Sequence, residues 1–402
     1  TLNTSLALNQ DLSVITKGLS LKALVNFKNW SETSYTRSIK SNIYKVKDGS
    51  YNPETGEYDY QLLQTGDQFL SQSGIGRNSD QTFYFDARLD WKRSFGDHNL
   101  TAMAMYMMRE YRSDVLPNRN QGYSGRVTYD YASKYLVEFN FGYNGSERLA
   151  AGHRFEFFPA VSAGWVASSE NFWEPISKYI NHFKIRGSYG LVGSDAFASG
   201  APHFLYQNNI GIGSAHNFWT GLPTSEISKK GPGFYVLAVQ DAGWEHVKKF
   251  DIGFDMMLFN QLNITFDYFH DKRERILMSR ASWPSMLGYW GSKPWSNIGE
   301  VENQGFELSL NWTKQFGKDL TLDLRGNFTY NQNEYKYVDE PSYPYVWQTN
   351  TGKPLNTVKG YIAEGLFTSE EEIANSPDQS QLGANIMPGD IKYRDINGDG
   401  QI

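Results

Sequence analysis

The sequence predicts an all-β protein, a transmembrane antiparallel up-and-down β-barrel, from three observations. Many stretches alternate apolar and polar side chains with the period of two that a β-strand imposes. Aromatic residues make up 15% of the 402 residues, and tyrosines flank the apolar centres of the alternating stretches, as expected of strands that cross two bilayer interfaces. Short and long connections also alternate along the chain, which is typical of the two rims of such a barrel.

Residues 122–144 show the alternation most clearly. Tyr123 and Val127 share one face of the first strand, while Arg126 and Asp130 lie on the other. After a short turn the return strand repeats the pattern, with its apolar and aromatic residues at odd-numbered positions. A soluble β-sandwich would give the same alternation, but rings with polar tips at both ends of an apolar centre favour a membrane strand.

The pattern predicts about a dozen strands. In chain order they occupy residues 1–11, 19–30, 83–91, 100–109, 122–131, 135–144, 157–167, 183–192, 250–258, 262–269, 306–313 and 320–330. On the hairpin at 250–269 we expect the even-numbered residues to face lipid. We expect the lumen to be lined by Asp251, Asp255, Asn263 and Asp267.

The connections sort strictly by length. Tight turns fall at 13–18, 96, 132, 260 and 317, together with a moderate connector at 168–181 that can hold one helical turn. Longer segments fall between them, and outer-membrane barrels place short turns in the periplasm and long loops outside the cell. A Greek-key sandwich has no reason to sort its connections in this way. We expect one barrel domain over residues 1–402, with long extracellular loops near 31–80, 193–245, 276–299 and 334–402.

Composition excludes several other classes of protein. No run of about 18 apolar residues exists, so the chain is not a helical membrane protein. The mean hydropathy of −0.55 fits a barrel whose lumen is wet. The absence of cysteine excludes disulfides, thiolate zinc sites and cysteine nucleophiles. The net charge of −6 argues against a nucleic-acid partner.

No catalytic constellation is evident, and we predict that the chain is not an enzyme. The seven histidines lack metal-ligand spacing such as HExxH, and the glycines at 211–213 have no strand-to-helix setting. Asp267 and Asp271 could serve as a glycosidase acid and base, but on a strand they are better explained as a hydrated polar wall.

One aromatic loop is a candidate substrate site. Exposed indole and phenol rings give flat faces on which sugar rings or peptide side chains pack. The alternative is that these rings pack the loop on its neighbours or lie in the aromatic girdle. The candidate residues are Trp283, Tyr289, Trp290 and Trp295.

The end of the chain carries a candidate calcium loop. Its spacing places side-chain oxygens at loop positions one, three and five and a backbone carbonyl at seven, in Asp395, Asn397, Asp399 and Gln401. The carboxylate expected at position twelve lies beyond Ile402, and no helix is predicted before the loop. The alternative is a turn rich in Asp, Asn and Gly that binds no metal. Calcium here would stiffen a surface loop and would not take part in catalysis.

Five stretches together resemble the SusC-type TonB-dependent outer-membrane transporters of Bacteroidetes. They are FPAVSAGWVASSENFW at 158–173, FKIRGSYGLVGS at 183–194, NIGEVENQGFELSLNW at 297–312, GYIAEGLFTSEEE at 360–372 and MPGDIKYRDINGDGQI at 387–402. The resemblance implies a 22-stranded barrel in the outer membrane of a Gram-negative bacterium, with an N-terminal plug and a TonB box. The chain shows neither of these, has no signal peptide and stops inside a motif, so we expect it to be an internal-to-late portion of the barrel.

The same resemblance implies a function and a set of partners. It implies TonB-energised uptake of oligosaccharides or peptides, together with a SusD-like surface lipoprotein, in a dimer of transporter–lipoprotein pairs surrounded by outer-membrane lipid. The alternative is a secreted, soluble all-β protein that binds or cleaves glycans and carries a calcium loop. Extraction separates the two, since only the transporter needs detergent.

Overall fold

The computed structural model describes residues 1–402 except 114, 198–199, 221–226, 285, 287–292 and 384. Twelve of the described strands form one antiparallel sheet, in which each strand pairs with its neighbours in chain order. They are β1 (Leu2–Asp11), β2 (Leu19–Ser38), β5 (Ser71–Phe95), β6 (His98–Arg112), β7 (Asn118–Tyr131), β8 (Tyr135–Ser146), β9 (Phe155–Val166), β10 (Ile180–Ser194), β13 (Glu245–Leu258), β14 (Leu262–Ser279), β15 (Trp295–Phe316) and β16 (Leu320–Tyr337). The predicted up-and-down arrangement of about a dozen strands is confirmed.

The remaining described elements are short and lie in the connections. Three small hairpins pair β3 (Ile43–Val46) with β4 (Tyr60–Gln64), β11 (Asn209–Thr220) with β12 (Ile227–Val236), and β17 (Ala363–Leu366) with β18 (Ile391–Tyr393). The helical turns are η1 (Ala167–Ser169), η2 (Asn171–Ile176), η4 (Val346–Gln348) and α1 (Glu370–Ala374). No helix among the described residues has the length and apolarity needed to cross a bilayer.

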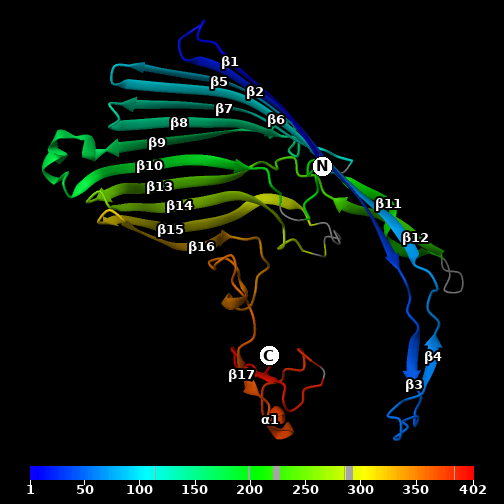
Figure 1. Cartoon of the computed structure of the whole chain (residues 1–402). Coiled ribbons are helices and arrows are strands. Elements are labelled where there is room, and N and C mark those ends of the chain that lie inside the picture. The colour runs from blue at the N-terminus through cyan, green and yellow to red at the C-terminus, as the bar shows by residue number, and fades with distance from the viewer. Residues whose placement is uncertain (114, 198–199, 221–226, 285, 287–292, 384) are drawn as a thin grey trace.

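The sheet is curved, and its two edges differ (Figure 1). The strand ends at the left of the view, here called the short-turn edge, are joined by the tight turns and by the connector with η1 and η2. The other, the long-loop edge, carries the extended connections, including the β3–β4 and β11–β12 hairpins. The predicted alternation of short and long connections is therefore present in space.

The first long loop is shorter than predicted. β2 and β5 continue to pair as far as Ser38 and Ser71, so the loop covers 39–70 and not 31–80. The last residues of β2 are exposed and mostly polar, so both faces meet water and the alternation that marks a membrane strand is lost. The other long connections cover 195–244, which contains β11 and β12, 280–294, and the segment after Tyr337.

One face of the sheet, here called the outer face, is apolar. In β13 to β16 its residues form cross-strand rows, of which two are Ile252, Tyr268, Phe306 and Tyr330, then Phe254, Phe266, Leu308 and Phe328. Towards the long-loop edge the apolar band gives way to a charged row of Lys248, Lys272, Glu302 and Glu334. Such a band bounded by polar residues is typical of the lipid-facing surface of a barrel.

The other face, here called the inner face, is polar. Asp251, Asp255 and Asp267 lie on it and ion-pair with Arg186 of β10. Phe254 lies on the opposite face, where its ring stacks on that of Phe266 with centroids 5.6 Å apart. The predicted assignment of the even and odd residues of this hairpin to two faces agrees with the structure.

Candidate functional site

The inner face carries a charge cluster at the middle of the wall. The guanidinium of Arg186 lies 2.7 Å from the carboxylate of Asp267, 3.3 Å from that of Asp255 and 3.4 Å from that of Asp251. Antiparallel pairing forces this meeting, because Arg186 lies opposite Gly253 and Gly253 lies opposite Asp267. With Lys184 of β10 opposite Asp255, two cations face three carboxylates, which leaves this part of the wall acidic.

A cavity of about 410 Å³ adjoins this cluster along β7, β8, β9, β10 and β13. Its polar lining includes Asp130, Glu138, Ser162, Lys184 and Arg186. The two carboxylates considered as an acid–base pair both have cationic partners, since Lys249 lies 3.3 Å from Asp271 and Arg186 binds Asp267. This arrangement agrees with the interpretation of a hydrated wall.

At the long-loop edge, strands β9 and β10 separate. They pair only over Lys184–Gly190, whereas β10 pairs with β13 as far as Ser194. The gap is occupied by Phe158, which packs against Trp244 with ring centroids 5.4 Å apart. Gly193 lies under that ring, and a Cβ at this position would meet the ring at 2.0 Å, so any side chain there would displace it.

An apolar cluster packs the loop at 195–244 onto the strand ends around this gap. The buried members come from β9, β14 and two connections, the β8–β9 loop and the loop at 195–244, and partly buried residues pack against them. The cluster, here called the rim cluster, consists of Leu149, Phe158, Leu205, Ala242, Trp244 and Leu277. It fixes the position of a loop that would otherwise be free to move at the mouth of the barrel.

The return of this loop into β13 is held by polar contacts. Asn297 accepts a hydrogen bond from the Gly243 N–H at 3.0 Å and donates to the carbonyls of Gly243 and Arg275. Arg275 has a φ of 57°, at an irregularity of the β14–β15 ladder, and its guanidinium reaches Glu156 at 3.4 Å. His246 lies 2.8 Å from the same carboxylate. The bulge thus turns Arg275 towards Glu156 of β9, which is separated from β14 in the sheet by β10 and β13.

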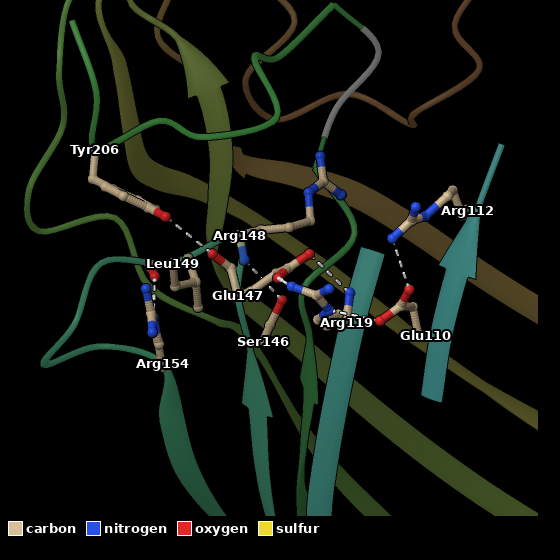
Figure 2. A network of polar contacts seen from close by, with 9 residues as sticks. All are labelled: Glu110, Arg112, Arg119, Ser146, Glu147, Arg148, Leu149, Arg154 and Tyr206. Carbon is tan, nitrogen blue, oxygen red and sulfur yellow. Dashed lines mark hydrogen bonds and ion pairs between the residues drawn. The ribbon is translucent and has the colours of Figure 1, made fainter. Parts of the chain in front are cut away.

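A second polar network lies where β6, β7 and β8 reach the long-loop edge (Figure 2). Arg119 lies between two carboxylates, 2.8 Å from Glu110 and 3.6 Å from Glu147. Arg148, in the next loop, lies over the ring of Phe197, with Cζ of the guanidinium 4.0 Å from the ring centroid. Burial lowers the pKa of Arg148, and the nearby carboxylate of Asp195 opposes that effect. These contacts anchor the β8–β9 loop to the neighbouring strands and to the loop at 195–244.

The predicted aromatic loop is only partly within the described residues. Tyr289 and Trp290 lie outside them. Trp295 begins β15 and packs, half-buried, against the rim cluster, as the packing alternative expects. Trp283 is also half-buried, in the connection before β15. A substrate role for these four residues stays a prediction.

The candidate calcium loop is folded by its own hydrogen bonds. The Asp395 carboxylate accepts bonds from the backbone N–H groups of Gly398 at 2.7 Å and Gly400 at 2.8 Å. Asn397 donates through Nδ2 to Asp399 at 2.7 Å, and the Gln401 N–H donates to Asp399 at 2.9 Å. Among the described residues, no group of three or more His, Cys, Asp or Glu side chains could hold a metal. Calcium binding here stays a prediction, which titration calorimetry with calcium chloride would test.

Sequence reasoning missed two features. Arg186 was not singled out, although its position opposite the carboxylates follows once β10 and β13 are paired. The segment at 338–402 showed no period, yet in it the rings of Tyr345 and Trp347 stack in parallel. Only the density of aromatic residues there could have indicated it.

An antiparallel sheet with an apolar outer face, a polar inner face and connections sorted by edge defines the class of transmembrane β-barrels. Within that class the chain belongs to the TonB-dependent receptor family. The family described as "TonB dependent receptor-like, beta-barrel" matches residues 2–384. This membership confirms the predicted fold class and places the protein in the outer membrane.

Curated relatives support the SusC-type resemblance. The chain is 29% identical to TonB-dependent receptor P3 of Formosa agariphila over 385 residues, which cover 83% of the chain and 36% of that relative. It is 25% identical to TonB-dependent receptor SusC of Bacteroides thetaiotaomicron over 401 residues, covering 94% of the chain and 35% of SusC. The chain thus spans about a third of the length of these relatives.

Solved structures show the same fold. The RagAB peptide importer in its open-open state superposes with a TM-score of 0.64 at 18% identity, covering 88% of this chain and 39% of that one. The closed-closed state of the same importer gives a TM-score of 0.60 at 19% identity, covering 83% and 36%. At this identity the likeness speaks for the fold alone.

Proposed function

We propose that this chain is part of a TonB-energised transporter that takes up oligosaccharides or peptides across the outer membrane. The observation that carries the proposal is the division of one sheet into two faces. The outer face presents aromatic and aliphatic rows, and the inner face presents a charged wall with an adjoining cavity of about 410 Å³. A soluble glycan-binding protein would have no use for an apolar face of this extent, because water would meet it.

The acidic middle of the wall is suited to a polar, hydrated occupant. Two carboxylates near Arg186, those of Asp251 and Asp255, are about one-third exposed. Groups of this kind hydrogen-bond to hydroxyl, amide and ammonium groups, which oligosaccharides and peptides both carry. An apolar solute would displace water from the polar groups of the wall without forming hydrogen bonds in its place.

We also propose that a SusD-like lipoprotein covers the long-loop edge and that two such pairs form a dimer. Support comes from the SusC relative and from the likeness in fold to the RagAB peptide importer. The loops at 39–70, 195–244 and 280–294 all leave this edge, so together they offer the surface for such a lid. The plug and the TonB contact belong to the longer protein.

Growth tests this function directly. A strain that lacks the gene for the full-length protein is grown on single nutrients, namely neutral glycans, anionic glycans and tryptic peptides, beside the parent strain and a strain lacking TonB. We expect one nutrient class on which the gene deletion and the TonB deletion fail alike. Normal growth of the gene-deletion strain on every nutrient, or growth unaffected by loss of TonB, contradicts the proposal.

A further inference from the structure

Two aromatic rings lie face to face in the segment at 338–402. The centroids of Tyr345 and Trp347 are 4.6 Å apart, and their planes are inclined by only 4°. Trp347 remains 45% exposed, so one face of the stacked pair is open to solvent. A cavity of about 350 Å³ adjoins the pair and is bordered on another side by Tyr361. This volume lies at the small end of the range of about 300–1,000 Å³ that holds small-molecule ligands.

The pair is held in place before any ligand arrives. The Lys353 ammonium donates to the carbonyls of Val346 at 3.2 Å and Trp347 at 2.6 Å, which fixes the turn that carries both rings. The hydroxyl of Tyr345 accepts a hydrogen bond of 2.7 Å from Nδ2 of Asn397. The loop predicted to bind calcium therefore forms a wall of this cavity and positions one of its rings. A site ordered in this way loses little conformational freedom on binding.

The polar side chains around the rings suit a neutral, hydroxylated ligand. The lining contains side-chain amides, one guanidinium and one carboxylate, in Gln348, Gln381, Arg394, Asn397, Asp399 and Gln401. Planar amide, guanidinium and carboxylate groups bind neighbouring hydroxyls through paired donors and acceptors. The guanidinium of Arg394 is paired with Glu364 at 2.8 Å, so this lining offers no unpaired cation to an anionic ligand. Oε1 of Gln348 is buried and has no hydrogen-bond partner among the described residues. This atom is therefore an acceptor that a ligand could use.

We propose that this cavity is a binding site for one sugar unit of a neutral oligosaccharide, which stacks its C–H face on Trp347. This inference rests on the proposed function and deepens it, since it favours glycans over peptides as the imported class. A peptide ligand would offer charged termini or apolar side chains, and the lining has neither an unpaired cation for a carboxylate terminus nor a closed apolar pocket. The segment that carries the site follows β16, and β16 ends at the long-loop edge. The site therefore lies on the side of the long loops.

The test uses the full-length protein in detergent and follows Trp fluorescence and calorimetric heat. The probes are maltohexaose, cellohexaose, laminarihexaose and xylohexaose, with a mixture of tryptic peptides as the second arm. The variants are Trp347→Ala and Trp347→Phe, and the matched control is Tyr343→Ala, an exposed ring in the same segment that does not line the cavity. We expect at least one hexasaccharide to bind, with about tenfold weaker affinity in Trp347→Ala and little change in the other two variants.

Binding of no hexasaccharide, or equal binding by Trp347→Ala and the parent protein, overturns the proposal. So does a peptide that binds in a Trp347-dependent manner. These results are separable from failure of the proposed function, because growth that depends on the gene and on TonB does not require that Trp347 be the contact. If growth is independent of TonB while Trp347-dependent sugar binding persists, the transport proposal fails and the sugar site stands.

Discussion

The sheet and the loops at its long-loop edge are stabilised in different ways. In the sheet, every strand pairs with its neighbours through backbone ladders. Most large apolar side chains of the outer face are not covered by other parts of the protein, because lipid covers that face in the membrane. At the long-loop edge the loops bury their own small core, in which Leu149 and Leu205 are fully buried. The sheet therefore depends on the bilayer, while the loops depend on local packing and polar contacts. Four substitutions test this difference.

The largest effect is expected from Leu205→Ala in the rim cluster. Removing a fully buried leucine leaves a cavity and should cost about 2–5 kcal/mol in the free energy of opening of the loop at 195–244. Hydrogen exchange at the amide of Val239, which donates to the Leu205 carbonyl at 2.7 Å, measures it. Ile212→Ala is the control, because Ile212 of the same loop is 94% exposed and should change little. Equal effects of the two substitutions would show that the rim cluster does not hold the loop.

Phe254→Lys places a charge on the outer face. It should cost about 2–4 kcal/mol if Phe254 lies near the bilayer midplane, because the ammonium loses its hydration in lipid. Asp255→Asn on the inner face should cost much less, since the side chain at position 255 remains in contact with water. Urea unfolding of the full-length protein in lipid vesicles compares the two. A smaller loss for Phe254→Lys than for Asp255→Asn would reverse our assignment of the faces.

Arg186→Leu leaves three carboxylates near one another without their cation. We expect a destabilisation of about 1–3 kcal/mol, which shrinks as salt is added. Arg126→Leu is a matched control on the same face, since Arg126 pairs with the single carboxylate of Glu138 and is half exposed. An exposed pair of that kind is worth about 0–1 kcal/mol. Unfolding in vesicles at low and high salt distinguishes the cluster from an ordinary surface pair.

The smallest expected effect is a loss of stability of the segment at 338–402 in acid. The backbone N–H and hydroxyl of Thr368 donate to Glu372, and the Lys392 ammonium lies 3.2 Å away, which lowers the pKa of Glu372 to about 2. Because the folded pKa lies below the ordinary value of 4.5, the stabilisation is complete above that pH and is lost as the pH falls towards 2.

Pepsin cleavage of the segment at 338–402 between pH 5 and pH 2 measures this loss. Cleavage should accelerate more than the intrinsic pH dependence of pepsin, which an unfolded peptide of the same sequence reports. In Glu372→Gln the extra acceleration should be smaller, and the rest should remain because the pKa values of Asp339, Glu340 and Asp395 in the same segment are also lowered. An identical pH profile for this variant and the parent protein would show that another group governs the segment.

The sequence predicted the sheet well because one physical constraint repeats along it. Where a strand has lipid on one side and water on the other, as at residues 250–258, alternation reveals both the strand and its faces. The end of β2 was missed because both of its faces meet water. The ring pair of Tyr345 and Trp347 was missed for a related reason, since contacts between positions in an irregular segment have no period to detect.

The incomplete ladder between β9 and β10 has a consequence for how the opening of the barrel is shaped. Along most of the wall the spacing of strands is set by backbone hydrogen bonds, which any sequence can form. Beyond Gly190 that spacing is set instead by the thickness of an aromatic ring lying over a bare backbone, at Phe158 and Gly193. The separation of these two strand ends therefore depends on side-chain volume. The paired residues from Lys184 to Gly190 keep their backbone ladder whatever side chain fills the gap.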